Sequence, residues 1–225
     1  MLLRLPGTYP AQGDTRLLTR TLVELDLAGG RDVLDVCTGG GALALAAARA
    51  GARRVTAIDL SMRSVLTARA NAVLAGVTVD VRRGDLFAPV RGRRFDLVVA
   101  NPPYVPAATD RLPRHRPGRS WDGGTDGRAV LDRICDDVHR VLAPGGHLLL
   151  TQSVLADAER TVERVTAAGL RAQVVARAPE PFGPVMRRRA ELLRARGLLR
   201  PGQDHEELVV IRAELPAAVE APRVA

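Results

Sequence analysis

Short apolar runs alternate along this chain with segments in which apolar residues recur at helical spacing. The runs typical of strands fall at residues 32–37, 54–59, 78–82, 95–100, 147–153, 171–177 and 207–212. The segments typical of helices fall at residues 42–51, 61–75, 126–142, 156–168 and 186–199. Strands joined through helices form right-handed crossovers. The order therefore predicts an α/β, Rossmann-like fold: a seven-stranded, mostly parallel sheet with helices on both faces.

Residues with known capping or breaking preferences set the expected ends of several helices. Asp14 is expected to cap a first helix that precedes the first strand, and Ser61 to cap the helix over residues 61–75. Pro144-Gly145-Gly146 is expected to stop the helix over residues 126–142.

Three segments lack a regular period: residues 1–13, 105–125 and 178–206. The last of them contains the helix predicted over residues 186–199, which is rich in arginine and is called the basic helix below. We expect an N-terminal lead-in and helix over residues 1–30, one domain over residues 31–215, and a disordered tail over residues 216–225.

Composition narrows the class of protein. At 225 residues and 46% hydrophobic content, the chain fits one domain of the larger sort. The net charge of +8 suggests nucleic acid, but all 33 basic residues are Arg, which is typical of a GC-rich genome. Two cysteines, a short apolar start and no apolar run near the roughly 20 residues of a membrane span predict a cytoplasmic protein without disulfides.

Polar and glycine landmarks follow the first four predicted strands in turn: Gly39, Asp59, Asp85 and Asn101. In parallel sheets, ligands bind outside the carboxyl ends of the strands. We therefore expect these residues to line one cleft.

The turn after the first strand is rich in glycine. Gly39, Gly41 and Ala44 satisfy the Gly/Ala form of the dinucleotide fingerprint, which taken alone is a weak signal. It indicates only that the backbone passes close to a ligand, and it leaves a nicotinamide cofactor open.

The acidic residues favour a sulfonium amino acid over a dinucleotide. Asp35 can face an ammonium group, directly or through water, and Asp59 can accept hydrogen bonds from both hydroxyls of a ribose. Asp85 can accept from an adenine amine while the Leu86 N–H meets a ring nitrogen. Any one of these residues could be an ordinary polar strand end. Three at matching strand ends indicate a binding site.

The tetrapeptide Asn101-Pro102-Pro103-Tyr104 directly follows the fourth strand. Two prolines stiffen the backbone and remove two N–H donors, and the residue before a proline is pushed toward an extended conformation. A rigid loop with an amide side chain and free carbonyls suits a planar NH2 group. This predicts methylation of an amide or amine nitrogen, with Asn101, Pro102 and Tyr104 as the catalytic residues.

Together these motifs resemble class I S-adenosylmethionine-dependent methyltransferases. The closest likeness is to the HemK/PrmC group, which methylates N5 of the glutamine in the Gly-Gly-Gln loop of peptide-chain release factors. Residues 9–18 resemble the segment that closes over the cofactor, and residues 120–127 a glycine-rich loop of that group. The candidate cofactor-binding residues are Asp35, Thr38, Gly39, Gly41, Asp59, Leu60, Asp85, Leu86 and Asn101.

The chain departs from the HemK/PrmC pattern in three places. Cys37 replaces the first glycine of the loop, and Pro10 and Gly13 alter the segment before the first helix. Few residues precede the first strand, where the longer bacterial enzymes carry a helical domain that grips the release factor. The resemblance is therefore to the short, single-domain branch, which in eukaryotes and archaea works with a small zinc-binding partner.

Other functions stay open on the sequence. The same tetrapeptide serves adenine N6-methylation of DNA or RNA, and a small-molecule amine is a further acceptor. A cofactor-binding subunit without catalysis is a different class. The basic stretches at residues 111–119 and 187–200 could contact RNA or a partner, or form a solvated arginine-rich face. Among the histidines and cysteines, no spacing typical of a metal site is present.

Overall fold

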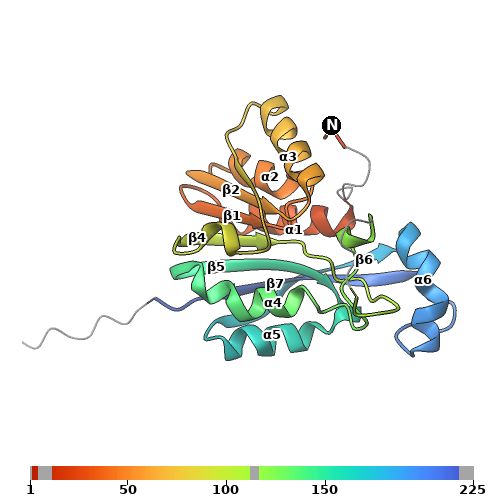
Figure 1. Ribbon diagram of the computed structural model, residues 1–225. Helices are drawn as coiled ribbons and strands as arrows, with labels where there is room; N and C mark the ends of the chain where they lie inside the picture. Colours follow the sequence, from red (N-terminus) through yellow and green to blue (C-terminus); the bar gives the residue numbers. More distant parts are fainter. Residues whose placement is uncertain (1, 5–11, 112–116, 218–225) are drawn as a thin grey trace, which may run out of the picture.

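The computed structural model describes residues 2–4, 12–111 and 117–217 (Figure 1). Its centre is a seven-stranded sheet in the order β3-β2-β1-β4-β5-β7-β6. The strands are β1 (Asp32–Val36), β2 (Arg54–Asp59), β3 (Asp80–Arg83), β4 (Phe95–Ala100), β5 (Leu142–Ser153), β6 (Arg171–Pro181) and β7 (His205–Glu214). Strands β1 to β5 pair in parallel, and β7 runs antiparallel to both β5 and β6. The mostly parallel seven-stranded sheet is confirmed.

Helices cover both faces of the sheet. They are α1 (Gly13–Glu24), α2 (Ala42–Arg49), α3 (Met62–Leu74), α4 (Leu131–Asp137), α5 (Ala158–Ala167) and α6 (Pro184–Ala195). Helices α1 and α2 contact each other, as do α4 and α5, and the two pairs flank the sheet (Figure 1). Every residue of β1 is buried, which is the pattern of a strand covered on both faces.

Four 3-10 helices complete the regular structure of the described residues: η1 (Ala88–Val90), η2 (Pro117–Ser120), η3 (Val138–Arg140) and η4 (Val154–Ala156). No helix among the described residues is long and apolar enough to cross a membrane.

The helix predicted over residues 126–142 is shorter than expected. It forms α4 and then tightens into η3, and Pro144-Gly145-Gly146 lies inside β5 instead of ending a helix. The cause is pairing with the end of the chain: Gly145 N donates to Leu215 O at 2.8 Å, and Leu215 N to Gly146 O at 2.9 Å. A partner more than sixty residues away along the chain overrides the local stop signal.

The two predicted helix caps have different outcomes. The Ser61 cap is confirmed, since its side chain accepts a hydrogen bond from Ser64 N at 3.4 Å. The Asp14 cap is wrong. Helix α1 begins at Gly13 with Gln12 as its N-cap, and Asp14 lies in the first turn with its carboxylate directed at other partners.

The irregular stretch between the last two strands is mostly ordered structure. Strand β6 extends to Pro181 and pairs with β7 along its length, and α6 connects them. Helix α6 has its own small core, formed by Phe182, Met186, Ala190, Leu193 and Leu199. Val105 packs against this core, so α6 lies beside the loop that follows β4.

Candidate active site

Asp35 is fully buried at the end of β1 and holds the turn that follows it. Its Oδ2 atom accepts hydrogen bonds from Thr38 Oγ1 at 2.5 Å and from Ala44 N at 3.0 Å. Its Oδ1 atom is buried and has no hydrogen-bond partner among the described residues. Burial raises the pKa of Asp35 to about 7. An unpartnered buried carboxylate oxygen is a position where a cationic ligand group would be stabilised.

The turn after β1 is built on left-handed backbone. Cys37, Gly39 and Gly41 have φ values of 61°, 55° and 85°. At Gly41 a Cβ atom would lie 3.1 Å from the Cβ of Ala68 on α3, so a side chain there would be strained and crowded. Cys37 adopts the same region with a side chain, and burial raises the pKa of its thiol. The thiol is therefore protonated near neutral pH.

Asp59 ties the ends of β1 and β2 together. Its Oδ2 atom accepts from Gly39 N at 2.9 Å, and its Oδ1 atom accepts from Ser61 N at 2.8 Å. Burial raises the pKa of this carboxyl as well. The structure thus brings Asp35, Thr38, Gly39, Gly41 and Asp59 together at the carboxyl edge of the sheet.

Asp85 lies at the outer side of this group. It accepts a hydrogen bond from Arg133 Nη2 on α4 at 2.7 Å, and its side chain is half-exposed. The following residue, Leu86, has a positive φ of 46° and is buried. Arg133 is a partner of Asp85 that the strand-end argument did not include.

Asn71 on α3 supports the glycine turn from behind. Its Nδ2 atom donates to Gly40 O at 2.8 Å and to Leu3 O at 3.0 Å, and Leu3 N donates to its Oδ1 at 2.7 Å. Sequence reasoning missed this residue. Nothing in the sequence marks a mid-helix Asn as a link between the N-terminal segment and the turn after β1.

Asn101 begins the loop after β4, next to the end of β1, since Ala100 is the register partner of Val36. Its Nδ2 atom donates to Thr15 Oγ1 on α1 at 3.3 Å. This contact uses the amide nitrogen and not the amide oxygen, Oδ1. Pro102 is buried behind it.

Tyr104 is 7% exposed, and its hydroxyl donates to Asp14 Oδ2 at 3.1 Å. The first turn of α1 therefore contacts both polar members of the tetrapeptide. The glycine-rich loop packs beneath it: at Gly127, whose φ is 78°, a Cβ atom would lie 2.4 Å from Tyr104 O. Val105 N donates to Trp121 O at 2.8 Å, and Gly123 N to Val105 O at 3.0 Å.

Two arginines of the basic helix brace the loop that follows Tyr104. Arg189 forms an ion pair with Asp122 and donates to Pro106 O at 3.0 Å. Arg196 donates to Ala107 O at 2.8 Å and to Thr125 O at 3.2 Å. These two residues follow neither prediction for this basic stretch, contact with RNA or a partner or a solvated face, because they bind other parts of the chain. Residues 112–116 of the other basic stretch lie outside the described residues.

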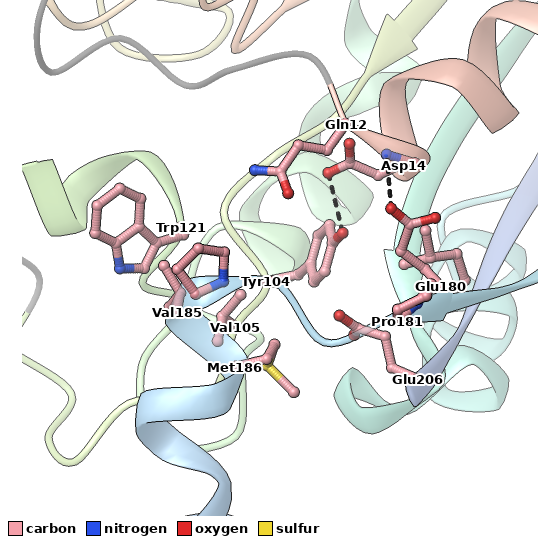
Figure 2. A pocket seen from close by; sticks show the side chains of 14 residues that line it. Gln12, Asp14, Tyr104, Val105, Trp121, Glu180, Pro181, Val185, Met186 and Glu206 are labelled. Atoms are coloured by element: carbon pink, nitrogen blue, oxygen red, sulfur yellow. Dashed lines mark hydrogen bonds between the residues drawn. The ribbon is translucent and has the colours of Figure 1, made fainter. Parts of the chain in front are cut away.

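A pocket that opens to solvent lies beside Tyr104 (Figure 2). Asp14 from α1, Glu180 from β6 and Glu206 from β7 line it on one side, and Trp121 and Met186 line the other. Sequence reasoning missed these carboxylates as site residues. They come from three distant segments. The antiparallel β6–β7 pairing places Glu180 opposite Glu206, and the hydrogen bond from Gly13 N to Glu180 brings the start of α1 beside them. Residues 9–11 of the segment expected to close over the cofactor lie outside the described residues.

The chain is similar in sequence to known methyltransferases. The family model of the methyltransferase small domain matches residues 7–112. The MJ0928 protein of Methanocaldococcus jannaschii, assigned as a protein N5-glutamine methyltransferase, is 32% identical over 181 residues. That alignment covers 80% of this chain and 90% of the relative. The release factor glutamine methyltransferase of Mycolicibacterium smegmatis is 36% identical over 76% of this chain and 63% of its own length.

Bacterial relatives of this kind, which include a ribosomal protein uL3 glutamine methyltransferase, are longer, and the chain spans between 39% and 63% of their length. Among solved structures, the Mtq2–Trm112 complex of E. cuniculi, responsible for methylation of the termination factor eRF1, superposes with a TM-score of 0.63 at 22% identity. It covers 92% of this chain and 98% of that one, and it confirms the class I methyltransferase fold. The chain belongs to the HemK/PrmC-type family of protein N5-glutamine methyltransferases.

Proposed function

We propose that this protein transfers a methyl group from S-adenosylmethionine to the side-chain amide nitrogen of a glutamine in the Gly-Gly-Gln loop of a peptide-chain release factor. The observation that carries the proposal is the placement of Asn101. Its amide is oriented by Thr15 and lies at the strand end next to the Asp35 turn. An acceptor for N–H groups and a site for a cationic amino acid therefore adjoin each other.

The residues of the β1 and β2 ends fit the cofactor. The unpartnered Oδ1 atom of Asp35 suits an ammonium group, and Asp59 offers carboxylate oxygens for ribose hydroxyls. The residues that would hold the cofactor are Asp35, Thr38, Gly39, Gly41, Asp59, Leu60, Asp85, Leu86 and Asn101. When bound, S-adenosylmethionine supplies a methyl group on a positively charged sulfur.

In this proposal Asn101 and Pro102 overcome the weak nucleophilicity of an amide nitrogen. Asn101 Oδ1 and the Pro102 carbonyl oxygen each accept one N–H of the substrate amide. This fixes the nitrogen in position and stabilises the positive charge that develops on it. No general base is needed, because the methylated amide is strongly acidic and loses its extra proton to water.

Tyr104 is the third predicted catalytic residue. Its hydroxyl is held by Asp14 and its ring is buried, so in this proposal it forms one wall of the acceptor site, against which the planar amide group packs. A small partner subunit belongs to the proposal as well, since the E. cuniculi structure is a two-protein complex. Methyl transfer should be measured with and without a small zinc-binding protein from the same genome.

The test is transfer of a labelled methyl group to purified release factor, with Gly-Gly-Gln and Gly-Gly-Ala versions compared. We expect label on the first and none on the second. Ribosomal protein uL3 is the comparison substrate. Label that persists on the Gly-Gly-Ala version, or that goes to uL3 alone, would overturn the release factor as acceptor.

A further inference from the structure

The carboxylate pocket, defined as the space lined by Asp14, Glu180 and Glu206, lies next to Tyr104 (Figure 2). Glu206 is 7% exposed, and its Oε2 atom has no hydrogen-bond partner among the described residues. Figure 2 shows its carboxylate directed into the pocket. A buried carboxylate oxygen without a donor is unfavourable unless a ligand supplies one.

No cation is among the described residues that line this pocket. Glu180 Oε1 accepts from Gly13 N at 3.1 Å and from Arg16 Nη2 at 3.3 Å, but the Arg16 side chain is 71% exposed. Asp14 accepts from Tyr104 and, through Oδ1, from Thr15 N at 2.6 Å. Of these donors, Arg16 alone carries a charge.

The pKa of Glu206 is consistent with a buried carboxyl group next to other carboxylates. This pKa is raised to about 7, chiefly by burial, against a hydrogen bond with Ser153 that lowers it, and the Asp14 and Glu180 carboxylates add smaller increases. A cation entering the pocket would favour the ionised form and relieve the repulsion among the three groups.

The opposite wall of the pocket is apolar. Trp121, Val185 and Met186 line it, and such a surface suits the aliphatic stem of an arginine or lysine whose charged end reaches the carboxylates. We propose that the carboxylate pocket binds a cationic side chain, arginine or lysine, of the protein acceptor near the residue that is methylated.

The position of the pocket ties it to the acceptor and not to the cofactor. It shares Tyr104 with the tetrapeptide, and Asp14 and Thr15 are neighbours on the turn that orients Asn101. A side chain in the pocket would therefore belong to a residue close in sequence to the target glutamine. This inference rests on the proposed function, because it names a feature of the acceptor for the same site.

The first test compares Gly-Gly-Gln peptides that carry one arginine at successive positions on either side of the glutamine, with citrulline in the matched controls. At one position or more, we expect the arginine peptide to have a KM about tenfold lower than its citrulline control, with kcat unchanged. Glu206→Gln should remove this difference. Glu207→Gln should retain it, because Glu207 is exposed and pairs with Arg177 at 2.8 Å. Equal KM values at every position, or a difference that survives in Glu206→Gln, would overturn the proposal.

A second test does not need methyl transfer. Trp121 is the one tryptophan of the chain and lines the pocket, so its fluorescence reports on ligand binding there. Acetyl-Gly-Arg-Gly amide should change the fluorescence of the wild-type protein and of Glu207→Gln, but not of Glu206→Gln, and the citrulline peptide should change none. If no peptide is methylated but this response is seen, the pocket assignment holds and the glutamine acceptor is wrong. No response from the wild-type protein would overturn the pocket assignment.

Discussion

The cofactor side and the acceptor side of this active site are built in different ways. On the cofactor side, Asp35 contacts Thr38 and Ala44 within its own turn, and Asp59 reaches Gly39 on the neighbouring strand end. On the acceptor side, Asn101 contacts Thr15 and Tyr104 contacts Asp14, residues that are 86 and 90 positions apart. The cofactor side is therefore built largely from residues of short sequence motifs, whereas the acceptor side forms only when distant segments pack together in the fold.

The largest expected effect is that of replacing Asn101, which should lower the rate of methyl transfer while cofactor binding is retained. Asn101→Ala removes the N–H acceptor and should lower the rate of methyl transfer about a thousandfold, since positioning and charge stabilisation are both lost. S-adenosylmethionine should still raise its melting temperature. Thr15→Val, which removes only the orienting hydroxyl, should lower the rate about tenfold. Residual transfer near the wild-type rate in Asn101→Ala would contradict the assignment.

On the cofactor side, affinity should depend on pH through Asp35. Its pKa of about 7 means that the carboxylate needed by an ammonium group is largely protonated at lower pH. Affinity for S-adenosylmethionine should therefore fall up to about tenfold per pH unit below about pH 7. Asp35→Asn should bind more weakly than wild type above about pH 7, approach the wild-type affinity at low pH and show a flat profile in calorimetry. Methylthioadenosine, which lacks the amino acid, is the ligand control and should also be flat. A flat wild-type profile would remove Asp35 from the cofactor site.

The contrast between the two sides also explains what the sequence could predict. The strand runs, the Ser61 cap and the Asp35, Gly39 and Asp59 cluster follow from local pattern and from the rule that parallel strands end at one edge. The start of β5 could not be predicted, because Gly145 and Gly146 pair with Leu215. Helix periodicity cannot report a partner of that kind.

Side-chain contacts between distant segments could not be predicted from the sequence for the same reason. Asp14 has the sequence context of a helix cap, yet its carboxylate reaches Tyr104. Asp85 follows its strand as predicted, yet it pairs with Arg133 on α4. The Glu206 site needs the antiparallel β6–β7 pairing, which no local signal specified.

The acceptor side should lose more stability than the cofactor side when one supporting side chain is removed. Arg189→Ala leaves Asp122 without its ion-pair partner and frees two carbonyl groups of the loop, so the free energy of unfolding should fall by about 3 to 4 kcal/mol. Arg188→Ala, at an exposed position of the same helix, should change it by less than about 0.5 kcal/mol. Urea unfolding measures both. Equal effects would show that α6 does not brace the loop.

The carboxylate pocket should also affect how the free energy of unfolding depends on pH. The folded pKa of Glu206, about 7, lies above its ordinary value of 4.5, so the native state holds the proton more tightly. The resulting stabilisation is complete below about pH 4.5 and is lost as pH rises to about 7, up to about 3 kcal/mol. Unfolding free energy should fall over this range less in Glu206→Gln than in wild type. If the free energies of unfolding of the two proteins change equally with pH, the Glu206 carboxylate is exposed to water and this explanation is wrong.

The smallest expected effect is at Cys37 on the cofactor side. Its φ of 61° lies where a side chain costs energy and glycine does not. Cys37→Gly should therefore raise the free energy of unfolding by about 0.5 kcal/mol, after the larger chain entropy of glycine is allowed for. Cys37→Ala keeps the strained conformation and should give no gain. A loss of stability in Cys37→Gly would mean that packing of the thiol outweighs the backbone strain.

The central claim, that Asn101 presents a glutamine amide to the cofactor side, is tested most directly by locating the transferred methyl group. Release factor incubated with the enzyme and S-adenosylmethionine would be digested and sequenced by tandem mass spectrometry. The account predicts one added methyl group on the side chain of the Gly-Gly-Gln glutamine, and none when Asn101→Ala replaces the wild-type enzyme. A methyl group on any other residue, or on the same glutamine with the Asn101→Ala enzyme, would contradict it.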